Sequence, residues 1–199
     1  MNAMDSDQTF LRSEERPPYE EGAESLRIVD LFCGAGGLTL GLAEAARQLG
    51  LAIEIPLAVD FDEDVCAVYS ANFPKANAVA SNVAAQFDGC FGEEPTGSEQ
   101  SLANELARVD FLVGGPPCQG HSDLNNHTRR DDPRNSFYER MGRAAEILKP
   151  AVLLIENVPP VRHDESGVVE RTVAHLEHLG YDVAQHVISL ADLGVSQSR

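Results

Sequence analysis

From Leu26 onward, short apolar runs alternate with longer amphipathic stretches, and this alternation limits the fold more than any other feature of the chain. The runs have the length of buried strands, and the stretches between them have the length and periodicity of helices. Such an alternation is typical of βαβ units, in which a helix connects two neighbouring parallel strands. The sequence therefore predicts an α/β fold with a doubly wound, mostly parallel sheet.

The pattern also predicts where the individual elements lie. Strands are expected over residues 27–32, 53–59, 76–80, 110–114, 151–155 and 181–187. Helices are expected between the first two strands up to about residue 50, and over residues 62–72, 102–107, 136–148 and 168–179. Glycine, proline and polar residues predict a surface loop over 88–101 and a long polar loop over 115–135. A polar loop of that length inside a compact domain commonly carries function.

The first 25 residues differ from the rest of the chain. They are rich in acidic residues, contain Pro17 and Pro18 and have no apolar period, so we expect an acidic disordered tail. A chain of 199 residues has the length of one domain with appendages. The expected organisation is a tail over residues 1–25 and one domain over residues 26–199.

Composition excludes several classes of protein. The chain is 43% hydrophobic and 24% charged, as globular domains are, and it has no apolar stretch of about 18 residues that would span a membrane. The N-terminus lacks the basic and apolar regions of a signal peptide, so we expect a cytoplasmic protein. The net charge of −17 argues against a simple nucleic-acid coat or a protein that binds anionic membranes, but it does not exclude a locally basic site.

The four cysteines, Cys33, Cys66, Cys90 and Cys118, are widely spaced and form no CxxC pair. None has a histidine at zinc-finger spacing, and the six histidines show no pattern of metal ligands. We therefore expect neither a disulfide framework nor a metal site. The alternative that stays open is one reactive thiol in a reducing compartment.

A glycine-rich turn from Cys33 to Gly37 follows the first predicted strand and precedes the first predicted helix. Backbone N–H groups at a helix N-terminus can contact a nucleotide closely where no side chain blocks the approach. Asp60 ends the next predicted strand, where a carboxylate is well placed to accept hydrogen bonds from a ribose diol. A glycine pattern alone fits an ordinary tight turn equally well. Together with Asp60, it favours a cofactor that contains a nucleoside.

Two further sets of polar residues follow predicted strands. Pro116 and Pro117 precede Cys118 after the fourth predicted strand, at the end where open α/β sheets bind ligands. Glu156 directly follows the fifth. Cysteines of cytosolic proteins are usually inert core residues, and a carboxylate at a strand end is often an ion-pair partner or a helix cap. The position of Cys118 on a polar loop above a cofactor cleft favours a nucleophile, and adjacent strands would bring Glu156 to the same rim as an acid.

These residues resemble the motifs of the cytosine-5 methyltransferases that act on nucleic acid. The sequence Asp30-Leu31-Phe32-Cys33-Gly34-Ala35-Gly36-Gly37 is similar to the family's S-adenosylmethionine loop. Pro117-Cys118-Gln119 resembles its nucleophile motif, Glu156-Asn157-Val158 its acid motif, and Gln197-Ser198-Arg199 the start of its Gln-x-Arg-x-Arg motif. The resemblance implies a Rossmann-like sheet of the S-adenosylmethionine-dependent methyltransferase type, incomplete at the C-terminus.

The resemblance also implies a role for each matching residue. The implied cofactor residues are Asp30, Phe32, Gly34, Gly36, Gly37, Leu38, Asp60, Phe61, Asn82, Val83, Gly115 and Pro116. Among them, Asp60 would hold the ribose and Phe61 would lie against the adenine, while Asn82 stands where the family usually has an aspartate that reads the adenine amino group. The residues implied to catalyse the reaction or to shape its pocket are Pro117, Cys118, Gln119, Glu156, Asn157 and Arg199.

In the implied reaction, a cytosine flipped out of DNA receives a methyl group on carbon 5 from S-adenosylmethionine. The Cys118 thiolate would add to carbon 6, Glu156 would stabilise the base at N3, and the loop over 120–135 would cover the base. The chain ends before the second arginine of the last motif and lacks the family's target-recognition region. We therefore expect either a fragment or one half of a split enzyme, with a second polypeptide as the partner.

Three alternatives stay open at this point. The chain could be a module that binds only cofactor or a partner, without activity of its own. The same motifs also occur in relatives that methylate transfer RNA, although we favour DNA because that group is larger. A nicotinamide dehydrogenase would share the glycine turn and Asp60, but nothing in its chemistry requires Pro117-Cys118-Gln119 with Glu156.

Overall fold

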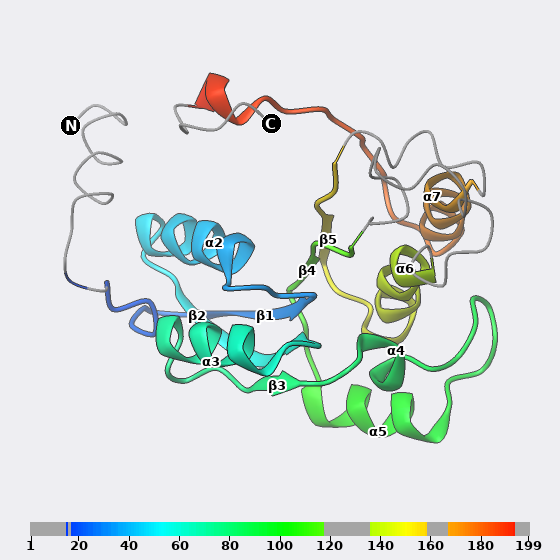
Figure 1. The fold of residues 1–199 in the computed structure, drawn as a ribbon, viewed down its shortest axis with the longest axis horizontal. Helices are drawn as coiled ribbons and strands as arrows, with labels where there is room; N and C mark the ends of the chain where they lie inside the picture. Colours follow the sequence, from blue (N-terminus) through cyan, green and yellow to red (C-terminus); the bar gives the residue numbers. More distant parts are fainter. Residues whose placement is uncertain (1–14, 16, 118–135, 159–166, 194–199) are drawn as a thin grey trace.

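The described residues form an α/β fold around one parallel sheet. This computed structural model describes residues 15, 17–117, 136–158 and 167–193. Five strands lie in the order β3-β2-β1-β4-β5, and every neighbouring pair is parallel (Figure 1). The strands are β1 (Ser25–Leu31), β2 (Ala52–Asp60), β3 (Ala78–Ala80), β4 (Phe111–Gly114) and β5 (Val152–Ile155). The predicted fold class is confirmed.

Helices follow the strands as βαβ units require. The helices are α2 (Gly37–Gln48) between β1 and β2, α3 (Glu63–Asn72) between β2 and β3, α4 (Val83–Gln86) and α5 (Gly97–Leu106) between β3 and β4, α6 (Ser136–Leu148) between β4 and β5, and α7 (Val168–His178) after β5. A short 3-10 helix, η4, covers Leu190–Leu193. Figure 1 shows α2 and α3 beside β1 and β2, and α6 with α7 on the side of β5.

Side chains of the sheet alternate between two hydrophobic layers. On β1, Ile28 belongs to the layer packed by α2 and α3, whereas Val29 and Leu31 belong to the layer packed by α4, α5, α6 and α7. On β4, Val113 and Leu112 divide in the same way. Because both faces of the central strands are buried, these strands appear in the sequence as continuous apolar runs rather than as alternating ones.

The carboxyl ends of the parallel strands lie along one edge of the sheet. From β1 the chain continues outward to β2 and β3, and from β4 it continues outward to β5 on the other side. The strand order therefore changes direction between β1 and β4, and open α/β sheets bind ligands at such a point. The register pairs Leu31 with Gly114 and Gly114 with Ile155, so the segments that follow β1, β4 and β5 start side by side.

The loop predicted over 88–101 is wrong in its second part, because α5 begins at Gly97. A capping box sets this start: Glu99 N donates to Thr96 Oγ1 over 3.2 Å, and Thr96 N donates to the Glu99 carboxylate over 3.0 Å. The Thr-x-x-Glu signal is present in the sequence, but the neighbouring glycine and proline residues favour a loop. The short helix α4 is likewise absent from the predicted elements.

The strand predicted over residues 181–187 is also wrong, because these residues form irregular chain. Tyr181 and Val183 pack partly against the core, whereas Val187 and Ile188 are 62% and 60% exposed. A strand needs a neighbour that completes its backbone hydrogen bonds. Among the described residues β5 pairs only with β4, so no further strand is available to these residues.

Residues 17–24 pack against the sheet instead of belonging to the acidic tail that their composition predicts. Tyr19 is 2% exposed, and its carbonyl oxygen accepts a hydrogen bond of 2.8 Å from Ile53 N. Ala52 N donates to Glu24 O over the same distance. A single buried aromatic residue has no period, so the sequence pattern gives no signal for this contact. Residues 1–14 and 16 lie outside the described residues.

Candidate active site

The glycine loop, residues 33–37, joins the end of β1 to the N-terminus of α2. Gly34 and Gly36 have φ angles of 53° and 92°, in the region that favours glycine. Gly36 also needs its small size, because a Cβ there would lie 2.7 Å from Phe73 Cε2 and 3.1 Å from Tyr69 Cε2. Among the described residues, no side chain caps the N-terminus of α2, so its first N–H groups can serve a ligand.

Phe32, immediately before the loop, has a φ angle of 57°. For a bulky residue this is an uncommon and costly conformation, and such backbone occurs preferentially at functional sites. Its ring contacts that of Phe137 in α6, with ring centroids 5.5 Å apart. The contact with cofactor that the sequence predicts for Phe32 stays a prediction.

Side chains from β2 and α3 hold the glycine loop in place. Gly34 N donates to Asp60 Oδ2 over 3.0 Å, and Asn72 Nδ2 donates to Ala35 O over 2.9 Å. The other oxygen of Asp60 accepts a hydrogen bond of 3.1 Å from Asp62 N. A carboxylate oxygen can accept two hydrogen bonds, so Asp60 keeps capacity for a ribose. Its predicted role with ribose remains a prediction.

Other predicted cofactor residues lie around the ends of β2 and β3 in different environments. Phe61 follows β2 directly and is 83% exposed, so its ring is accessible to a flat apolar ligand. Asn82 caps α4, since its Oδ1 accepts a hydrogen bond of 2.9 Å from Ala84 N. Val83 is 2% exposed within the core, so its side chain is not open to a ligand, and Leu38 is half-buried against the layer of α2 and α3.

Asp30 lies beneath the glycine loop rather than at its surface. It is 1% exposed, and its Oδ2 accepts a hydrogen bond of 2.6 Å from Thr39 Oγ1. Burial raises the pKa of Asp30 to about 7, although the neighbouring hydroxyl groups of Thr39 and Tyr69 lower it. A buried carboxyl in this position supports the loop from below.

Sequence patterns did not identify three residues at the end of α3 that contact the glycine loop. Tyr69, Asn72 and Phe73 follow an i, i+3, i+4 spacing, and this spacing places them on one side of the helix end. Tyr69 and Phe73 pack their rings 5.1 Å apart below Gly36. The available signal in the sequence was the hydroxyl of Tyr69 and the amide of Asn72 close to the aromatic residue Phe73. Helices on a protein surface commonly show the same combination.

The segments that follow β4 and β5 meet at the same edge. Glu156 N donates to Gly114 O over 2.9 Å, and Asn157 Nδ2 donates to Pro116 O over 3.2 Å. A Cβ at Gly115 would lie 3.4 Å from Glu156 Oε2, so glycine leaves room beside this carboxylate. Asn157 thus fixes the segment that leads through Pro117 to Cys118 against the strand end that carries an exposed Glu156.

Several predicted residues fall outside the described part of the chain. These are Cys118, Gln119, Arg199 and the loop over 120–135. Their roles stay predictions, as do the catalytic or pocket-shaping roles of Pro117, Glu156 and Asn157.

Acidic residues gather around the glycine loop. Asp30 and Asp60 are joined by the carboxylates of Asp62, Glu63 and Asp64 at the first turn of α3. None of the five forms a salt bridge with another described residue. This charge would repel the pyrophosphate of a dinucleotide and would attract a cationic ligand.

Replacing Gly36 by alanine is expected to lower the free energy of unfolding by about 2–4 kcal/mol, because the Cβ would strain a left-handed residue and collide with Phe73. Binding of a nucleoside cofactor should weaken with it. Denaturant unfolding and titration calorimetry measure the two effects. Gly41→Ala is the matched control in α2, where a Cβ meets open space and helix propensity should add up to about 1 kcal/mol of stability. Unchanged stability in the Gly36 variant would contradict the role assigned to this residue.

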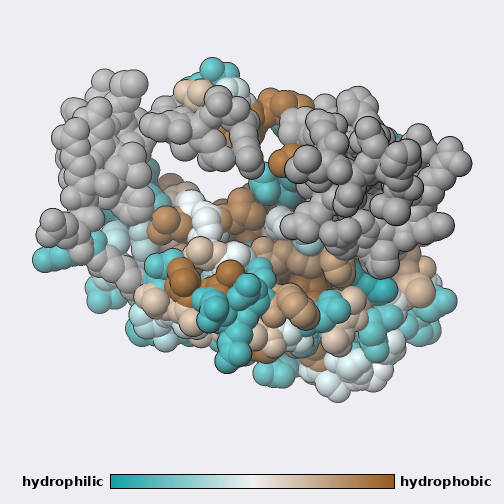
Figure 2. All heavy atoms as spheres, in the orientation of Figure 1, coloured by the Kyte–Doolittle hydropathy of each residue, from teal (hydrophilic) through white to brown (hydrophobic). Residues whose placement is uncertain are grey.

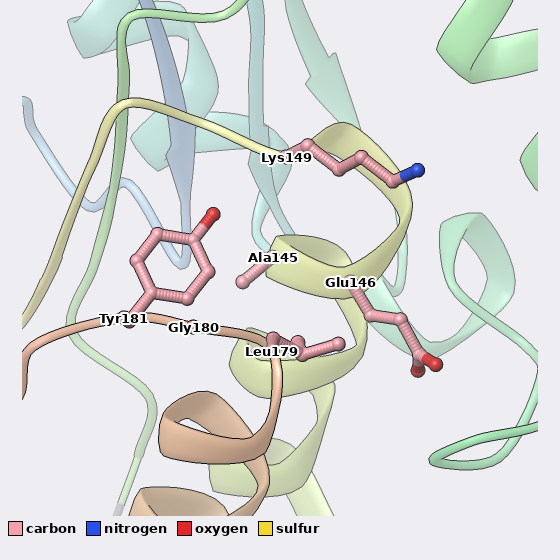
Figure 3. Close-up of a pocket in the computed structure, with 6 residues that line it drawn as sticks. All are labelled: Ala145, Glu146, Lys149, Leu179, Gly180 and Tyr181. Carbon is pink, nitrogen blue, oxygen red and sulfur yellow. The ribbon is translucent and has the colours of Figure 1, made fainter.

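A cavity of about 200 Å³ lies at the opposite edge of the sheet, beside the start of β5 (Figure 3). Tyr181 OH donates to Pro150 O over 2.8 Å there, and Figure 3 shows the charged ends of Lys149 and Glu146 directed away from the Tyr181 ring. The lining residues are Ala145, Glu146, Lys149, Leu179, Gly180 and Tyr181. Without converging polar groups, this cavity is a poorer candidate than the edge that carries the glycine loop.

Among the residues that the structure describes, no three His, Cys, Asp or Glu side chains gather as metal ligands. Within the same residues, no helix combines the length and the apolar character needed to cross a membrane.

Comparison with known proteins adds independent evidence. A family model of C-5 cytosine-specific DNA methylases matches residues 26–199. The Type II methyltransferase M1.BsuMI of Bacillus subtilis (strain 168) is 42% identical over 193 residues, which are 97% of this chain and 45% of that protein. The Type II methyltransferase M1.HphI of Haemophilus parahaemolyticus is 33% identical over 180 residues, with 88% of this chain and 44% of that protein covered. The chain therefore spans less than half the length of these curated relatives.

Solved structures show the same fold. An E. coli protein described as a DNA modification methyltransferase encoded within a prophage has a TM-score of 0.59 at 28% identity, over 77% of this chain and 38% of its own. The Dnmt2 methyltransferase of S. pombe has a TM-score of 0.60 at 17% identity, over 87% of this chain and 46% of its own, which supports the fold alone. Strand order, motif positions and a family model that covers most of the chain agree. The chain belongs to the family of C-5 cytosine-specific DNA methylases.

Proposed function

We propose that this chain is the part of a DNA methyltransferase that binds S-adenosylmethionine and carries the nucleophile for methylation of cytosine at carbon 5. One observation supports this most directly: in a chain of this family, the segment leading to Cys118 lies against the strand end that bears Glu156, held by the bond from Asn157 to Pro116 O. Nucleophile and acid would then share one rim above the cofactor.

The residues present fit S-adenosylmethionine. The glycine loop offers backbone N–H groups, Phe61 offers an exposed ring for the adenine, and Asp60 keeps capacity for the ribose. The acidic surroundings suit the positive charge of S-adenosylmethionine. When bound, the cofactor supplies a methyl group activated by a positively charged sulfur.

The chemistry assigned to this chain begins at Cys118. Its thiolate adds to carbon 6 of the flipped cytosine, and the electron pair of the ring double bond becomes available at carbon 5. Glu156 donates a proton to N3 and so stabilises the charge that develops on the base. After methylation, loss of the proton from carbon 5 to water re-forms the double bond and releases Cys118 as a thiolate, and the proton on N3 returns to Glu156.

Further polypeptide is proposed to complete the domain and to recognise DNA. On β5, the side chains of Val152 and Leu154 are 43% and 44% exposed, and Val187 and Ile188 are more exposed still. Figure 2 shows hydrophobic residues along the stretch of chain that crosses the top of the view between two grey regions. The curated relatives are more than twice as long as the matched region. Polypeptide equivalent to the remaining part of these relatives, in the same protein or in a second chain, would cover the exposed side chains of β5 and of residues 187–188.

The cytoplasmic location expected from the sequence is part of this proposal; the described cysteines Cys33, Cys66 and Cys90 form no disulfide with one another.

The test of this proposal has two stages. The chain alone should bind S-adenosylmethionine in titration calorimetry. Mixed with the C-terminal part of M1.BsuMI, it should transfer label from tritiated S-adenosylmethionine to DNA, and digestion should yield 5-methylcytosine. Absence of cofactor binding would overturn the proposal. Label that appears only in transfer RNA would select the RNA alternative, and cofactor binding without transfer would select the binding module.

A further inference from the structure

A chain of buried hydroxyl groups runs beneath the glycine loop. Thr39 Oγ1 donates to Asp30 Oδ2 over 2.6 Å and lies 2.8 Å from the Tyr69 hydroxyl. A hydroxyl has one hydrogen, so with Asp30 ionised the Thr39 hydrogen points to Asp30 and Tyr69 donates to Thr39. The three residues come from β1, α2 and α3, and each is at most 1% exposed.

The chain of hydroxyl groups ends on an acceptor that is not satisfied. Asp30 Oδ1 is buried and has no hydrogen-bond partner among the described residues. None of the described basic residues forms a salt bridge with Asp30 either. A buried carboxylate in this state is costly, so its presence next to the ligand edge of the sheet indicates a use.

Two of the three residues also lie next to the glycine loop or in the helix that follows it. Thr39 lies in the first turn of α2, and the Tyr69 ring lies directly beneath Gly36. We propose that Thr39 and Tyr69 are positioning residues for the cationic methyl donor: through Asp30 they fix the glycine loop and hold a negative charge beneath it. This inference rests on the proposed function and adds an electrostatic contribution that would act on the charged donor and not on its uncharged product.

The charged and titratable groups around Asp30 support this assignment. Cys33 faces it from the loop, Asp60 from β2 and Tyr69 from α3. Burial raises the pKa of Cys33 and of Tyr69, so both stay neutral near pH 7. Burial also raises the pKa of Asp30 to about 7, with a further contribution from Asp60. Because a cation favours the ionised carboxylate, donor affinity should rise as the pH increases through this value.

The experiment compares two ligands that differ in one charge. S-adenosylmethionine has a positive sulfur, whereas S-adenosylhomocysteine has a neutral thioether on the same nucleoside. Each is titrated by calorimetry into the full chain and its variants at about pH 6 and about pH 8. We expect Tyr69→Phe and Thr39→Val to weaken donor binding about three- to tenfold and product binding less than about twofold. Asp30→Asn should remove the pH dependence of donor binding.

Controls separate positioning from general damage to the fold. Thr39→Ser keeps the hydroxyl and should restore donor affinity to within about twofold of the wild type. Ser70→Ala removes an exposed hydroxyl of α3, bonded only to Cys66 O, and should change neither ligand. Equal weakening of both ligands, or a donor affinity independent of pH in the wild type, would overturn this inference alone. A wild-type chain that binds neither ligand would overturn it together with the proposed function.

Discussion

Replacing Cys118 by serine is expected to reduce methyl transfer to DNA by roughly a thousandfold or more, because removal of a catalytic nucleophile has effects of at least this size. A serine hydroxyl stays protonated near neutral pH and is a far weaker nucleophile than a thiolate, so carbon 6 of the base would not be attacked. The measurement is label transfer from tritiated S-adenosylmethionine to DNA, with the chain completed as in the test above.

The matched control for this variant is Cys90→Ser. Cys90 is an exposed free cysteine in the segment between α4 and α5. This variant should keep full activity. Cys118→Ser should bind S-adenosylmethionine as the wild type does, because the glycine loop is untouched. Transfer by Cys118→Ser within about tenfold of the wild type would contradict the covalent mechanism.

Arg143→Met is expected to lower the free energy of unfolding by about 3–5 kcal/mol. Arg143 is 1% exposed and makes a two-pronged contact with Glu99, with Nε to Oε1 at 3.0 Å and NH2 to Oε2 at 2.6 Å. It also binds Glu146 and the carbonyl oxygens of Glu93 and Glu94. Without the guanidinium, the buried carboxylate of Glu99 has no cation, and a loss of this size is a large part of a domain's stability.

Two further variants distinguish loss of the ion pair from loss of packing. Arg47 forms an exposed pair with Glu44, and Arg47→Met should change stability by less than about 1 kcal/mol. The double variant Glu99→Met with Arg143→Met should recover part of the loss, because the carboxylate of Glu99 no longer lies buried without its cation. The recovery is incomplete because the hydrogen bonds from Thr96 N and Gly89 N to Glu99 are lost as well. Denaturant unfolding gives both values. A double variant no more stable than Arg143→Met would contradict the unpaired charge of Glu99 as the main cause of the loss.

The same contact gives stability a pH dependence. Burial by itself would raise the pKa of Glu99, but hydrogen bonds from Arg143 and from the backbone N–H groups of Thr96 and Gly89 bring it below the ordinary value. A carboxylate whose pKa is lowered by folding stabilises the folded state fully above its ordinary pKa of about 4, and this effect is lost as the pH falls below that value through the lowered pKa of the folded state. Acid unfolding of the wild type should include this contribution, and the double variant should lack it.

Strand positions were predictable from the sequence where both faces of the strand are buried. The runs that form β1, β2, β4 and β5 lie within a few residues of their expected places, because a strand covered on both sides must be apolar throughout. The strand predicted over residues 181–187 does not form because it lacks a neighbouring strand among the described residues. An apolar alternation shows that a segment can form a strand, but hydrogen bonds from a neighbouring strand decide whether it does, and the described residues provide none.

The candidate site was likewise predictable from the sequence only in part. The glycine loop, Asp60 and Glu156 were recognisable because their chemistry depends on residue type and on position after a strand. The bond from Asn157 to Pro116 O and the contact of Tyr69 with Thr39 join residues 41 and 30 positions apart. No local pattern records such pairs, because they depend on which strands and helices become neighbours.

The sequence by itself determined the class of fold, the order of the motifs and the family, since these depend on hydrophobic periodicity and on residues at fixed spacing. Only the tertiary structure decided that Asp30 is a buried carboxyl bonded to Thr39, that α3 supports the glycine loop, and that Arg143 joins α6 to Glu99. The physical reason is that burial and hydrogen bonding belong to pairs of atoms in space, and packing of the two layers on the sheet selects these pairs.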